Sequence, residues 1–553
     1  MDIFGTTIVA IHEIYNITVF IRGVVKSTQN FDADRVSIEH RLHHELLFLD
    51  SFKSLFFDDD GAFISNEHLP IYLKHDVHNT IMYLRKSLAE YGMLAAKYEV
   101  LDIQTDGHEQ TGSANNTKDM SVSVYQRVKG RVEDLKKRAV DWALFDKTKM
   151  LKTLEEYSAQ TERLRQTMSL MLLTMAAMGS TELRDFAESK RARNMGLQNV
   201  VKRQLLTLGH PPDDFTALGG WLEEIAESST GSNLKLARYE GDWGPVQTVV
   251  VEYRKYDDTL MTAPDISFDK SMAPIRDLAW LLVSATGLDK KEVITVGGAS
   301  YGPSISTLPC LGYLDEPGEG RTAFLYQLPR SQDIQPVGNI VTLHGRINDQ
   351  SFRGRPPLGS RFLLAHTLAS TLLGIHTCGW VHKNISSRGI IVYPSVGRQR
   401  LIPYVAGWGY ARNIDGGTLL VNADTDLEAN LYRHPLRQGQ PRDSFKPEHD
   451  IYTLGVILLE IALWRTVSDV FKKQIEAAST TGKVPEPERI TRALVDIAHQ
   501  DIPGEMGEGY ARAVERCLTG DFGVQADGDP KQTQLSVAFR ELVVDVVATG
   551  IEL

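Results

Sequence analysis

The sequence predicts a multidomain α + (α+β) protein, in which an all-α N-terminal bundle precedes a small strand-rich part and a larger helical part. Three observations support this. The chain has 553 residues, which is too long for one hydrophobic core. Roughly its first 205 residues carry apolar positions at helical spacing. After residue 235, β-branched runs of strand length appear, and helical patterns dominate again from residue 358.

Composition excludes several classes of protein. The 60 Lys and Arg residues against 71 Asp and Glu residues give a formal net charge of −11, which argues against a nucleic-acid binder. The three cysteines, Cys310, Cys378 and Cys517, form no C-x-x-C pair. We therefore expect no disulfide scaffold, no metal site and a reducing compartment. No basic leader precedes the N-terminal apolar run, so we expect no secretory signal.

The first half contains four helical segments. They cover residues 35–57, 69–100, 121–178 and 181–205, with a loop rich in Gly, Ser, Asn and Thr at 105–119. We expect the charged segment 181–205 to be a bracing or linking helix. The apolar face of the first segment comprises Val36, Leu42, Leu46, Leu49 and Phe52.

A stripe of methionines ends the third segment. Met168, Met171, Met175 and Met178 recur at three- and four-residue steps, so they share one helical face. The core of the bundle is the preferred interpretation, and an adaptable binding surface is the alternative.

A domain boundary follows the helical half. The breaker-rich stretches HPPDD (210–214) and SSTGSN (228–233) predict a linker at 206–234, between a bundle at 1–205 and a second domain at 235–553. In that second domain, QTVVVEY (247–253), ISTLPCLGY (305–313) and TAFLYQL (322–328) are the predicted strands.

Three later stretches resemble a protein kinase. LAHTLASTLLGIHTCGWVHKNI (364–385) resembles the αE helix and catalytic loop, HDIYTLGVILLEIALW (449–464) the αF helix, and VERCLTGDF (514–522) a late helix of the large lobe. The resemblance implies a two-lobed protein-kinase-like fold over 235–553, in which Asp450 holds the backbone of the catalytic loop. The loop letters HKN and the later YRHP (432–435) are similar to a fungal group of kinase-like domains.

The catalytic positions of this resemblance are changed. A working loop reads His-Arg-Asp with Asn five residues later, but GWVHKNISSRGI (379–390) puts His382, Lys383, Asn384 and Gly389 there. The Asp-Phe-Gly metal motif corresponds to Gly407, Trp408 and Gly409. The base and both metal ligands would then be missing, and these groups supply most of the catalysis of phosphoryl transfer. We predict a pseudokinase and not an enzyme; the alternative is a misalignment in which Asp415 serves as the metal ligand.

The small lobe departs from the kinase pattern too. The strand VVVEYRKY offers Glu252 or Arg254 where a kinase has its phosphate-pairing Lys, and Lys255 would require a register slip. GDWG (241–244) is far short of a glycine-rich loop and equally fits a hairpin turn. We expect no cofactor and no ATP binding, with Glu252, Arg254 and Tyr326 lining a degenerate pocket.

The helical half carries a second resemblance. In WALFDKTKMLKTLEEYSAQTERL (142–164), Trp142, Asp146, Lys147 and Lys149 match the W-x-x-x-D-K-x-K segment of fungal HeLo domains, the helical bundles of heterokaryon-incompatibility and cell-death proteins. Taken alone, these charges also read as an ordinary helix surface. The HeLo resemblance implies structural roles for Trp142 and Asp146, and an N-terminal helix that inserts into membranes on activation.

The N-terminal segment suits such a helix. Only Asp2, Glu13 and Arg22 are charged within its first twenty-five residues. A constitutive transmembrane helix is disfavoured, because a central acidic residue costs about 2.5–3.5 kcal/mol. At rest we expect the central buried helix of the bundle. The candidates for membrane insertion are Phe4, Ile8, Ile11, Glu13, Tyr15 and Val19.

The combined architecture resembles the mixed-lineage-kinase-domain-like executioners of animals and plants. It implies a regulated cell-death effector that is cytoplasmic at rest and acts on plasma-membrane lipids as a homo-oligomer. The trigger would be a binding event or a modification at the pseudokinase, from an upstream receptor or kinase that the sequence does not identify. Two alternatives remain: a signalling scaffold that acts only through protein interactions, and an atypical active kinase.

Overall fold

A computed structural model of the chain divides it into two compact units, the first spanning Met1–Lys202 and the second beginning at Arg203. The structure describes residues 3–26, 35–55, 69–98, 145–175, 180–226, 234–242, 244–256, 268–289, 305–329, 339–349, 355–395, 400–414, 427–482, 484–524 and 532–551. The predicted loop at 105–119 and the start of the segment 121–178 lie outside these residues.

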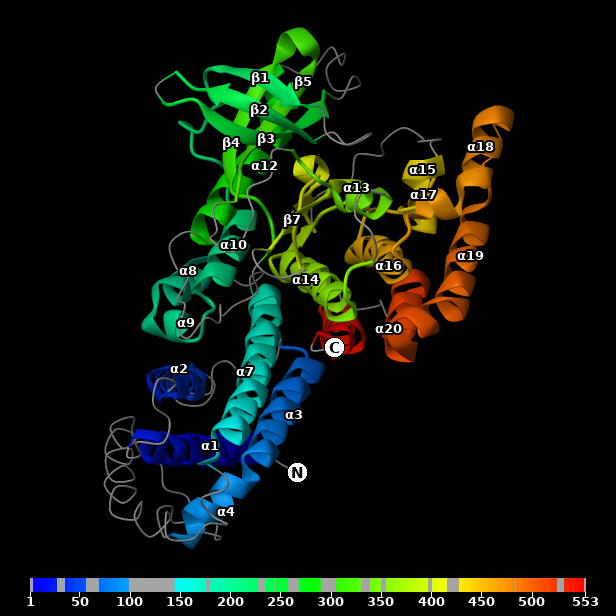
Figure 1. Cartoon of the computed structure of the whole chain (residues 1–553). Coiled ribbons are helices and arrows are strands. Elements are labelled where there is room, and N and C mark those ends of the chain that lie inside the picture. The colour runs from blue at the N-terminus through cyan, green and yellow to red at the C-terminus, as the bar shows by residue number, and fades with distance from the viewer. Residues whose placement is uncertain are drawn as a thin grey trace. The chain divides into compact units, whose positions relative to one another are not determined.

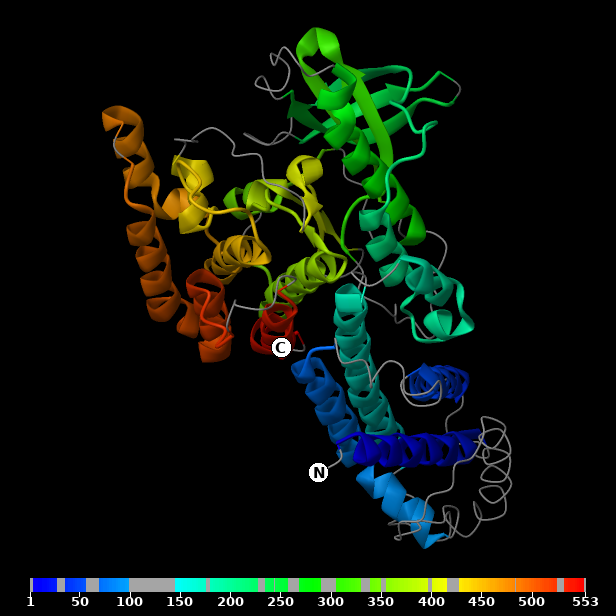
Figure 2. The same cartoon turned by 180° about the vertical axis from the view of Figure 1, so that it is seen from behind.

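The described part of the first unit is helical. Its helices are α1 (Ile3–Lys26), α2 (Arg35–Lys53), α3 (Ile71–Ser87), α4 (Ala89–Lys97), α7 (Lys147–Met175), α8 (Ser180–Glu188), α9 (Lys190–Asn194) and the first part of α10 (Gln198–Leu208). Helices α3 and α7 run side by side, and α1 packs against α2, α3 and α4 (Figures 1 and 2). The chain therefore begins with a helical region.

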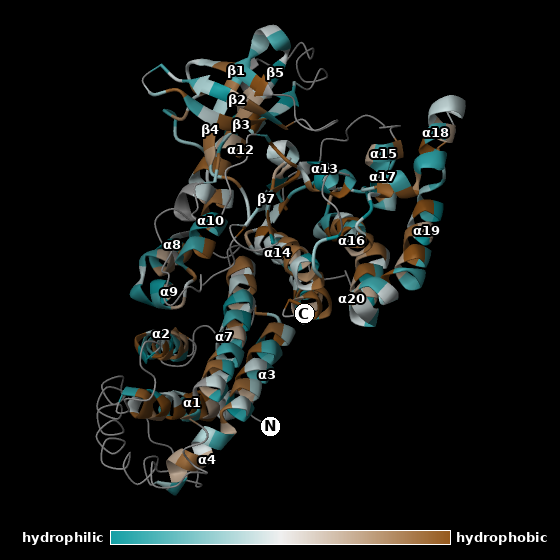
Figure 3. Cartoon of the chain, in the orientation of Figure 1, coloured by the Kyte–Doolittle hydropathy of each residue, from teal (hydrophilic) through white to brown (hydrophobic). Residues whose placement is uncertain are grey.

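Helix α1 lies in the core of this unit. Ile11, Ile14, Ile17 and Phe20 are at most 1% exposed, and Figure 3 colours much of the helix as hydrophobic. Buried Thr18 bonds the hydroxyl of Tyr157 on α7 at 2.9 Å. Gly5–Lys26 and Leu358–Thr377 are long and apolar enough to span a membrane, but both are mostly buried, and core helices of soluble proteins pass the same test.

Three details of the helical expectations differ from the structure. The segment 181–205 is not one brace but parts of α8, α9 and α10, because Ser189 caps α9 by accepting a hydrogen bond from the Ala192 N–H and Gly196 turns the chain at φ 69°. The segment 69–100 breaks at Leu88 into α3 and α4. Val36 is 59% exposed rather than part of the apolar face.

The methionine stripe is partly described. Met168 and Met171 are fully buried in the bundle, as the core interpretation predicts. The side chains of Met175 and Met178 lie outside the described residues.

A five-stranded antiparallel sheet opens the second unit. Its spatial order is β1-β2-β3-β5-β4, formed by β1 (Trp221–Ala226), β2 (Leu234–Glu240), β3 (Gln247–Lys255), β4 (Cys310–Glu316) and β5 (Arg321–Gln327), and α12 (Phe268–Asp289) packs beside β4. Gly241, Asp242 and Gly244 of the GDWG stretch lie in the connection between β2 and β3.

Strand β1 lies inside the segment 206–234 that we expected to be a linker. The sequence pattern does not reveal β1 because it is an edge strand. Trp221 and Ile225 are exposed, and acidic residues separate them, so the strand lacks the alternation of buried and exposed side chains that predicts a strand. The end of α10 also extends into this segment, to Leu208.

The rest of the second unit is mainly helical. It contains α13 (Leu343–Asn348), α14 (Leu358–Thr377), β6 (Trp380–Val381), β7 (Ile390–Pro394), β8 (Leu401–Val405), β9 (Arg412–Asn413), α15 (Leu427–Asn430), α16 (Pro447–Leu463), α17 (Val467–Val470), α18 (Lys472–Thr481), α19 (Pro487–Gln500), α20 (Ile502–Thr519), α21 (Thr533–Phe539) and α22 (Asp545–Ala548). A sheet-containing region with a mixed α/β layout therefore follows the helical region.

Helix α16 is the centre of this helical part. Nearly all of its residues are buried, and it packs against α14 and α20. Gly455 lets α20 approach, because a Cβ atom there would lie 2.7 Å from the Cβ of Cys517. The close approach requires a residue without a side chain.

Replacing Gly455 by Ala should destabilise the second unit. Overpacking costs about 1–3 kcal/mol, which outweighs the roughly 1 kcal/mol that Ala gains over Gly in a helix. Gly509→Ala is the matched control, because its Cβ would meet Val546 at an ordinary 3.6 Å. Urea unfolding should show opposite signs for the two variants, and equal stabilisation by both would contradict the packing.

Candidate functional site

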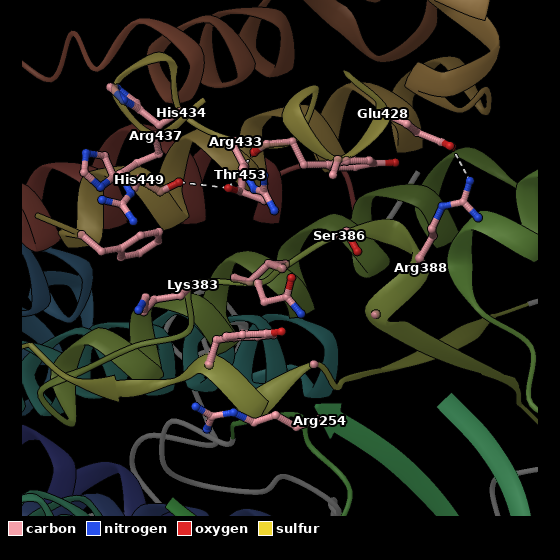
Figure 4. Close-up of a pocket in the computed structure, with 18 of the residues that line it drawn as sticks. Arg254, Lys383, Ser386, Arg388, Glu428, Arg433, His434, Arg437, His449 and Thr453 are labelled. Atoms are coloured by element: carbon pink, nitrogen blue, oxygen red, sulfur yellow. Dashed lines mark hydrogen bonds and ion pairs between the residues drawn. The ribbon is translucent and has the colours of Figure 1, made fainter. Parts of the chain in front are cut away.

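The candidate site is a cleft of about 600 Å³ in the second unit (Figure 4). We call it the polar cleft because charged and hydrogen-bonding side chains such as Arg254, Lys383 and Arg437 line it. One side is formed by β3 and by the loop that carries Lys383 and Asn384. The other side is formed by the segment from Glu428 to Thr453, with His449 and Thr453 on α16. Among the positions compared with a kinase, Lys383, Asn384, Gly389 and Gly407 line this cleft.

Two loops line the cleft, and Asp450 fixes the first of them, which carries His382, Lys383 and Asn384. Its carboxylate accepts hydrogen bonds from the backbone N–H groups of His382 (2.7 Å) and Lys383 (2.9 Å), and His376 Nε2 lies 3.4 Å away. Lys383 has φ 71°, which non-glycine residues rarely adopt. Because Asp450 is buried on the packed helix α16, its hydrogen bonds help to hold this loop in its unusual conformation.

His382 joins this loop to the second loop of the cleft. Its fully buried ring lies 4.6 Å from the ring of Trp408, centroid to centroid. Burial lowers the pKa of His382 to about 4, so the imidazole is uncharged at neutral pH. The side chain of Asn384 is exposed at the rim and offers an amide instead of a carboxylate.

Glu252 holds the second loop of the cleft, residues 407–409. Its buried carboxylate accepts hydrogen bonds from three consecutive backbone N–H groups, those of Gly407 (3.1 Å), Trp408 (3.2 Å) and Gly409 (2.9 Å). The hydroxyl of Tyr326 donates a fourth, at 3.2 Å. Successive N–H groups that point to one centre form an anion-binding nest, and here an internal carboxylate occupies it.

Strand register explains why the three predicted pocket residues meet. Val250 pairs with Tyr326 on β5, and Glu252 and Arg254 follow Val250 at steps of two, so they share its face of the sheet. Arg254 reaches the second loop, with its guanidinium 5.5 Å from the ring of Tyr410. The comparison with a kinase strand presents Glu252 as a lost lysine and does not indicate this role. The signal in the sequence is an acidic residue within an apolar strand, because burial of such a residue requires donors.

A side chain at any of the glycines of the two loops would be crowded. Gly407 has φ 89°, and a Cβ there would lie 3.1 Å from the carbonyl oxygen of Asn384. A Cβ on Gly409 would lie 3.1 Å from the carboxylate of Glu252, and one on Gly389 would lie 3.2 Å from the carbonyl oxygen of Ala406. Asp415, the alternative metal ligand, lies outside the described residues.

The acidic groups around the cleft are already engaged. Among the described residues that line it, Glu252 and Glu428 are the carboxylates. Glu428 pairs with Arg388 and accepts a hydrogen bond from Ser468. Asp443, Glu448 and His449 cluster closely enough to hold an ion, but the Lys446 ammonium lies 2.7 Å from Asp443 and 3.9 Å from Glu448, so that an internal cation already balances them.

A buried hydroxyl and carboxyl network lies behind the first loop. Tyr432 donates a hydrogen bond to Glu460 of α16 at 2.6 Å and also contacts the hydroxyl of Ser387 at 2.8 Å. Glu460 accepts a further bond from the Val467 N–H at 2.9 Å. Burial raises the pKa of Glu460 to about 7, despite these donors.

The membrane-insertion candidates of the first unit all lie on α1. Ile11 and Val19 are buried, while Ile8, Glu13 and Tyr15 are half-buried. Glu13 forms an ion pair with Arg85 of α3 at 2.7 Å. The side chain of Phe4 lies outside the description.

The segment that the sequence analysis compared with HeLo domains lies partly within the described residues. The Asp146 carboxylate accepts hydrogen bonds from the N–H groups of Thr148 (3.0 Å) and Lys149 (3.4 Å), which makes it a cap at the start of α7. Lys149 also pairs with Glu90 of α4 at 3.0 Å, in an exposed position. Trp142 and the side chain of Lys147 lie outside the described residues.

Comparison with known proteins found similarities among solved structures. No family model matches the sequence. No curated protein matches it either. A chain from the CAK complex of Chaetomium thermophilum, solved bound to ATP-gamma-S, matches over 58% of this chain and 88% of its own length, with 13% identity and a TM-score of 0.33.

Removing the Glu252 carboxylate should destabilise the second unit strongly. Glu252→Ala leaves three buried N–H groups and a phenol without their acceptor, at about 1–3 kcal/mol for each unpaired group. Glu223→Ala is the control, because Glu223 pairs with Arg238 in an exposed position and such pairs contribute about 0–1 kcal/mol. Urea unfolding distinguishes them, and similar losses for both would contradict the role of the nest.

Glu460 should make stability depend on pH. The raised pKa of Glu460 favours its protonated form in the folded state. The contribution of Glu460 to the free energy of unfolding is therefore complete below its ordinary pKa of 4.5 and is lost as the pH rises through about 7. Relative to Glu460→Gln, the wild-type protein should lose up to about 3 kcal/mol between pH 4.5 and pH 8. Urea unfolding of both proteins across this range measures the difference, and parallel pH profiles would exclude the titration.

Proposed function

We propose that the protein is a regulated cell-death effector, in which the helical first unit permeabilises membranes and a kinase-like second unit without phosphoryl transfer controls it. The protein would be cytoplasmic at rest. On activation it would act at the plasma membrane as a homo-oligomer. A binding event or modification at the second unit would shift the population towards the active form.

The character of α1 carries the proposal. The helix is long and apolar enough to span a bilayer, yet it lies buried in the bundle. Its described inner residues combine apolar side chains with one acidic residue, Glu13, which has a cationic partner on another helix. A helix with these properties can exchange one apolar environment for another when its partners release it.

Glu13 would need a new partner in a membrane. In the bundle its carboxylate lies 2.7 Å from Arg85, with the two side chains 28% and 42% exposed. At the centre of a bilayer an acidic residue costs about 2.5–3.5 kcal/mol. Association of several α1 helices would reduce this cost by giving Glu13 a polar neighbour, which is the reason for proposing an oligomer.

The second unit supports a regulatory role. An amide stands at Asn384, glycines stand at the two positions compared with metal ligands, and Glu252 fills the nest of the 407–409 loop. Phosphoryl transfer requires a carboxylate at the substrate hydroxyl and metal ions on the phosphates. These features favour a pseudokinase and oppose the alternative of an atypical kinase.

Dye release from liposomes tests the membrane role. The fragment 1–205, shown by circular dichroism to be helical, should release dye from vesicles of anionic or neutral lipid, whereas the full-length chain should not. The reason is that α1 is released only when the second unit no longer restrains the bundle. Silence of the folded fragment with both lipids would favour the scaffold alternative.

Two matched variants of the fragment separate membrane action from loosening of the bundle. Glu13→Gln and Arg85→Gln both break the same ion pair, but only the first removes the carboxylate that would face a pore or a partner helix in the assembled oligomer. Leakage should be lost in Glu13→Gln and retained in Arg85→Gln. Equal leakage by both variants would remove the role of Glu13.

A further inference from the structure

Residues 203–218 contact both the helical part and the sheet of the second unit. They comprise the end of α10 and the stretch that leads to β1. The sequence predicts a linker over most of this segment, but its side chains and backbone make specific contacts with four other elements. We call residues 203–218 the strap.

Two hydrogen bonds from side-chain amides hold the end of α10 to the helical part. Gln204 donates a buried bond to the carbonyl oxygen of Thr377 at 2.7 Å, where α14 ends. Asn413 of β9 donates to the carbonyl oxygen of Thr207 at 3.0 Å. Asn413 also pairs with Trp380 of β6, which leads into the first loop of the cleft. The end of α10 is therefore bonded to segments next to that loop.

Helix α10 also lies next to the second loop of the cleft. The buried side chain of Arg203 lines a cavity of about 30 Å³ together with Trp380 and Trp408. A cavity of this size holds about one water molecule, so little space separates the three side chains. Trp408 belongs to the 407–409 loop, which Glu252 fixes to β3. A movement of either loop would therefore disturb the packing around the end of α10.

The rest of the strap is held on the sheet side. A Cβ on Gly209 would lie 3.2 Å from the ring of Trp280, so the chain passes close to α12 (Figures 1 and 2). The ring of Phe215 lies 6.3 Å from that of Tyr313 on β4, centroid to centroid. The backbone N–H of Leu218 donates to the carbonyl oxygen of Tyr313 at 2.8 Å. The strap thus connects the surroundings of both loops with α12 and β4.

The position of the strap in the chain suits it to transmit a change. The boundary between the two units falls within α10, because Lys202 ends the first unit and α10 runs from Gln198 to Leu208. A continuous helix moves as one body, so a displacement of its end also displaces its start. Residues 208–210 and 212–214 are exposed, so a few specific contacts hold the strap. Segments with few buried contacts open more easily than the core.

We propose that the strap couples the two loops of the polar cleft to α10, so that the loops and the end of α10 open together in one local transition. A ligand or a modification that displaces either loop would then displace α10. The inference deepens the proposed function, on which its regulatory meaning rests, because it names the segment through which the second unit would control the bundle.

Native-state hydrogen exchange of the full-length chain tests the coupling without any variant. Below the urea concentration of global unfolding, the amides of residues 204–208 should exchange through the same opening as those of Ala411 and Ile414, which are hydrogen-bonded in and near β9. Their exchange should show one common dependence on urea. Different dependences would overturn the proposal. Exchange of both segments only through global unfolding, as we expect for buried α16, would overturn it too.

A matched pair of variants tests the same coupling from the strap. Gln204→Leu removes the donor to Thr377 at similar side-chain volume, and Ala411 and Ile414 should then exchange about fivefold faster, the factor that one hydrogen bond of average net contribution gives. Gln438→Leu is the control, because it removes a bond of the same kind, to the carbonyl oxygen of Arg433 at 2.8 Å, away from the strap. Equal rates in Gln204→Leu and wild type, or equal acceleration by both variants, would contradict the coupling.

Asn413→Ala tests the coupling from the side of the loops. Coupling between two sites is reciprocal, so loss of the bond to Thr207 should speed the exchange of residues 204–208. Unchanged exchange there, in a variant whose circular dichroism matches that of the wild type, would show that the loops do not hold α10.

Dye release separates a failure of the strap from a failure of the proposed function. Full-length Gln204→Leu should release dye from liposomes, whereas the full-length wild type and Gln438→Leu should not. Leakage by the folded fragment 1–205 without leakage by Gln204→Leu would overturn the role of the strap in control and leave the membrane role intact. Silence of the fragment would contradict the membrane role, and hydrogen exchange would then decide the coupling alone.

Discussion

The second unit depends on the carboxylate of Glu252. It joins the sheet to the 407–409 loop through three backbone N–H groups. That loop in turn places Trp408 against His382, whose backbone N–H is held by Asp450 of α16. A continuous series of contacts therefore runs from β3 to the central helix. Two buried carboxylates, one at each end, fix the two loops that carry the lining of the cleft.

The hydrogen bonds of the Glu252 and Asp450 carboxylates limit the chemistry that the cleft can support. Each accepts hydrogen bonds from backbone N–H groups, and buried N–H groups without acceptors are costly. Neither carboxylate can turn to a metal ion without leaving these donors unpaired. The groups that still face the cleft are mainly cations and hydroxyls. The two facing loops are thus held in place by carboxylates that are already engaged.

Sequence patterns predicted the elements with strong periodicity and missed those governed by tertiary contacts. The runs around Val250 and Phe324 became central strands, and the apolar run around Leu458 became the buried helix α16. Edge strand β1 was missed because exposed Trp221 and acidic neighbours show no buried alternation. The position of Asp450 followed from the motif, but the role of Glu252 did not. Three of its four donors are main-chain N–H groups 155 to 157 residues away, and backbone groups leave no trace in a sequence.

The two units differ in how easily their charged contacts can open. Glu13 and Arg85 are both partly exposed, so water can solvate them when they separate, and such pairs contribute about 0–1 kcal/mol. Releasing Glu252 would leave buried donors unpaired, so the 407–409 loop should stay in place around its carboxylate. The apolar face of α1 imposes the larger barrier, because each buried Ile or Phe contributes about 1.5–3 kcal/mol. Neither salt nor pH supplies that free energy. Helix α1 can leave the bundle only if another apolar environment receives it, and a bilayer or a second copy of the helix provides one.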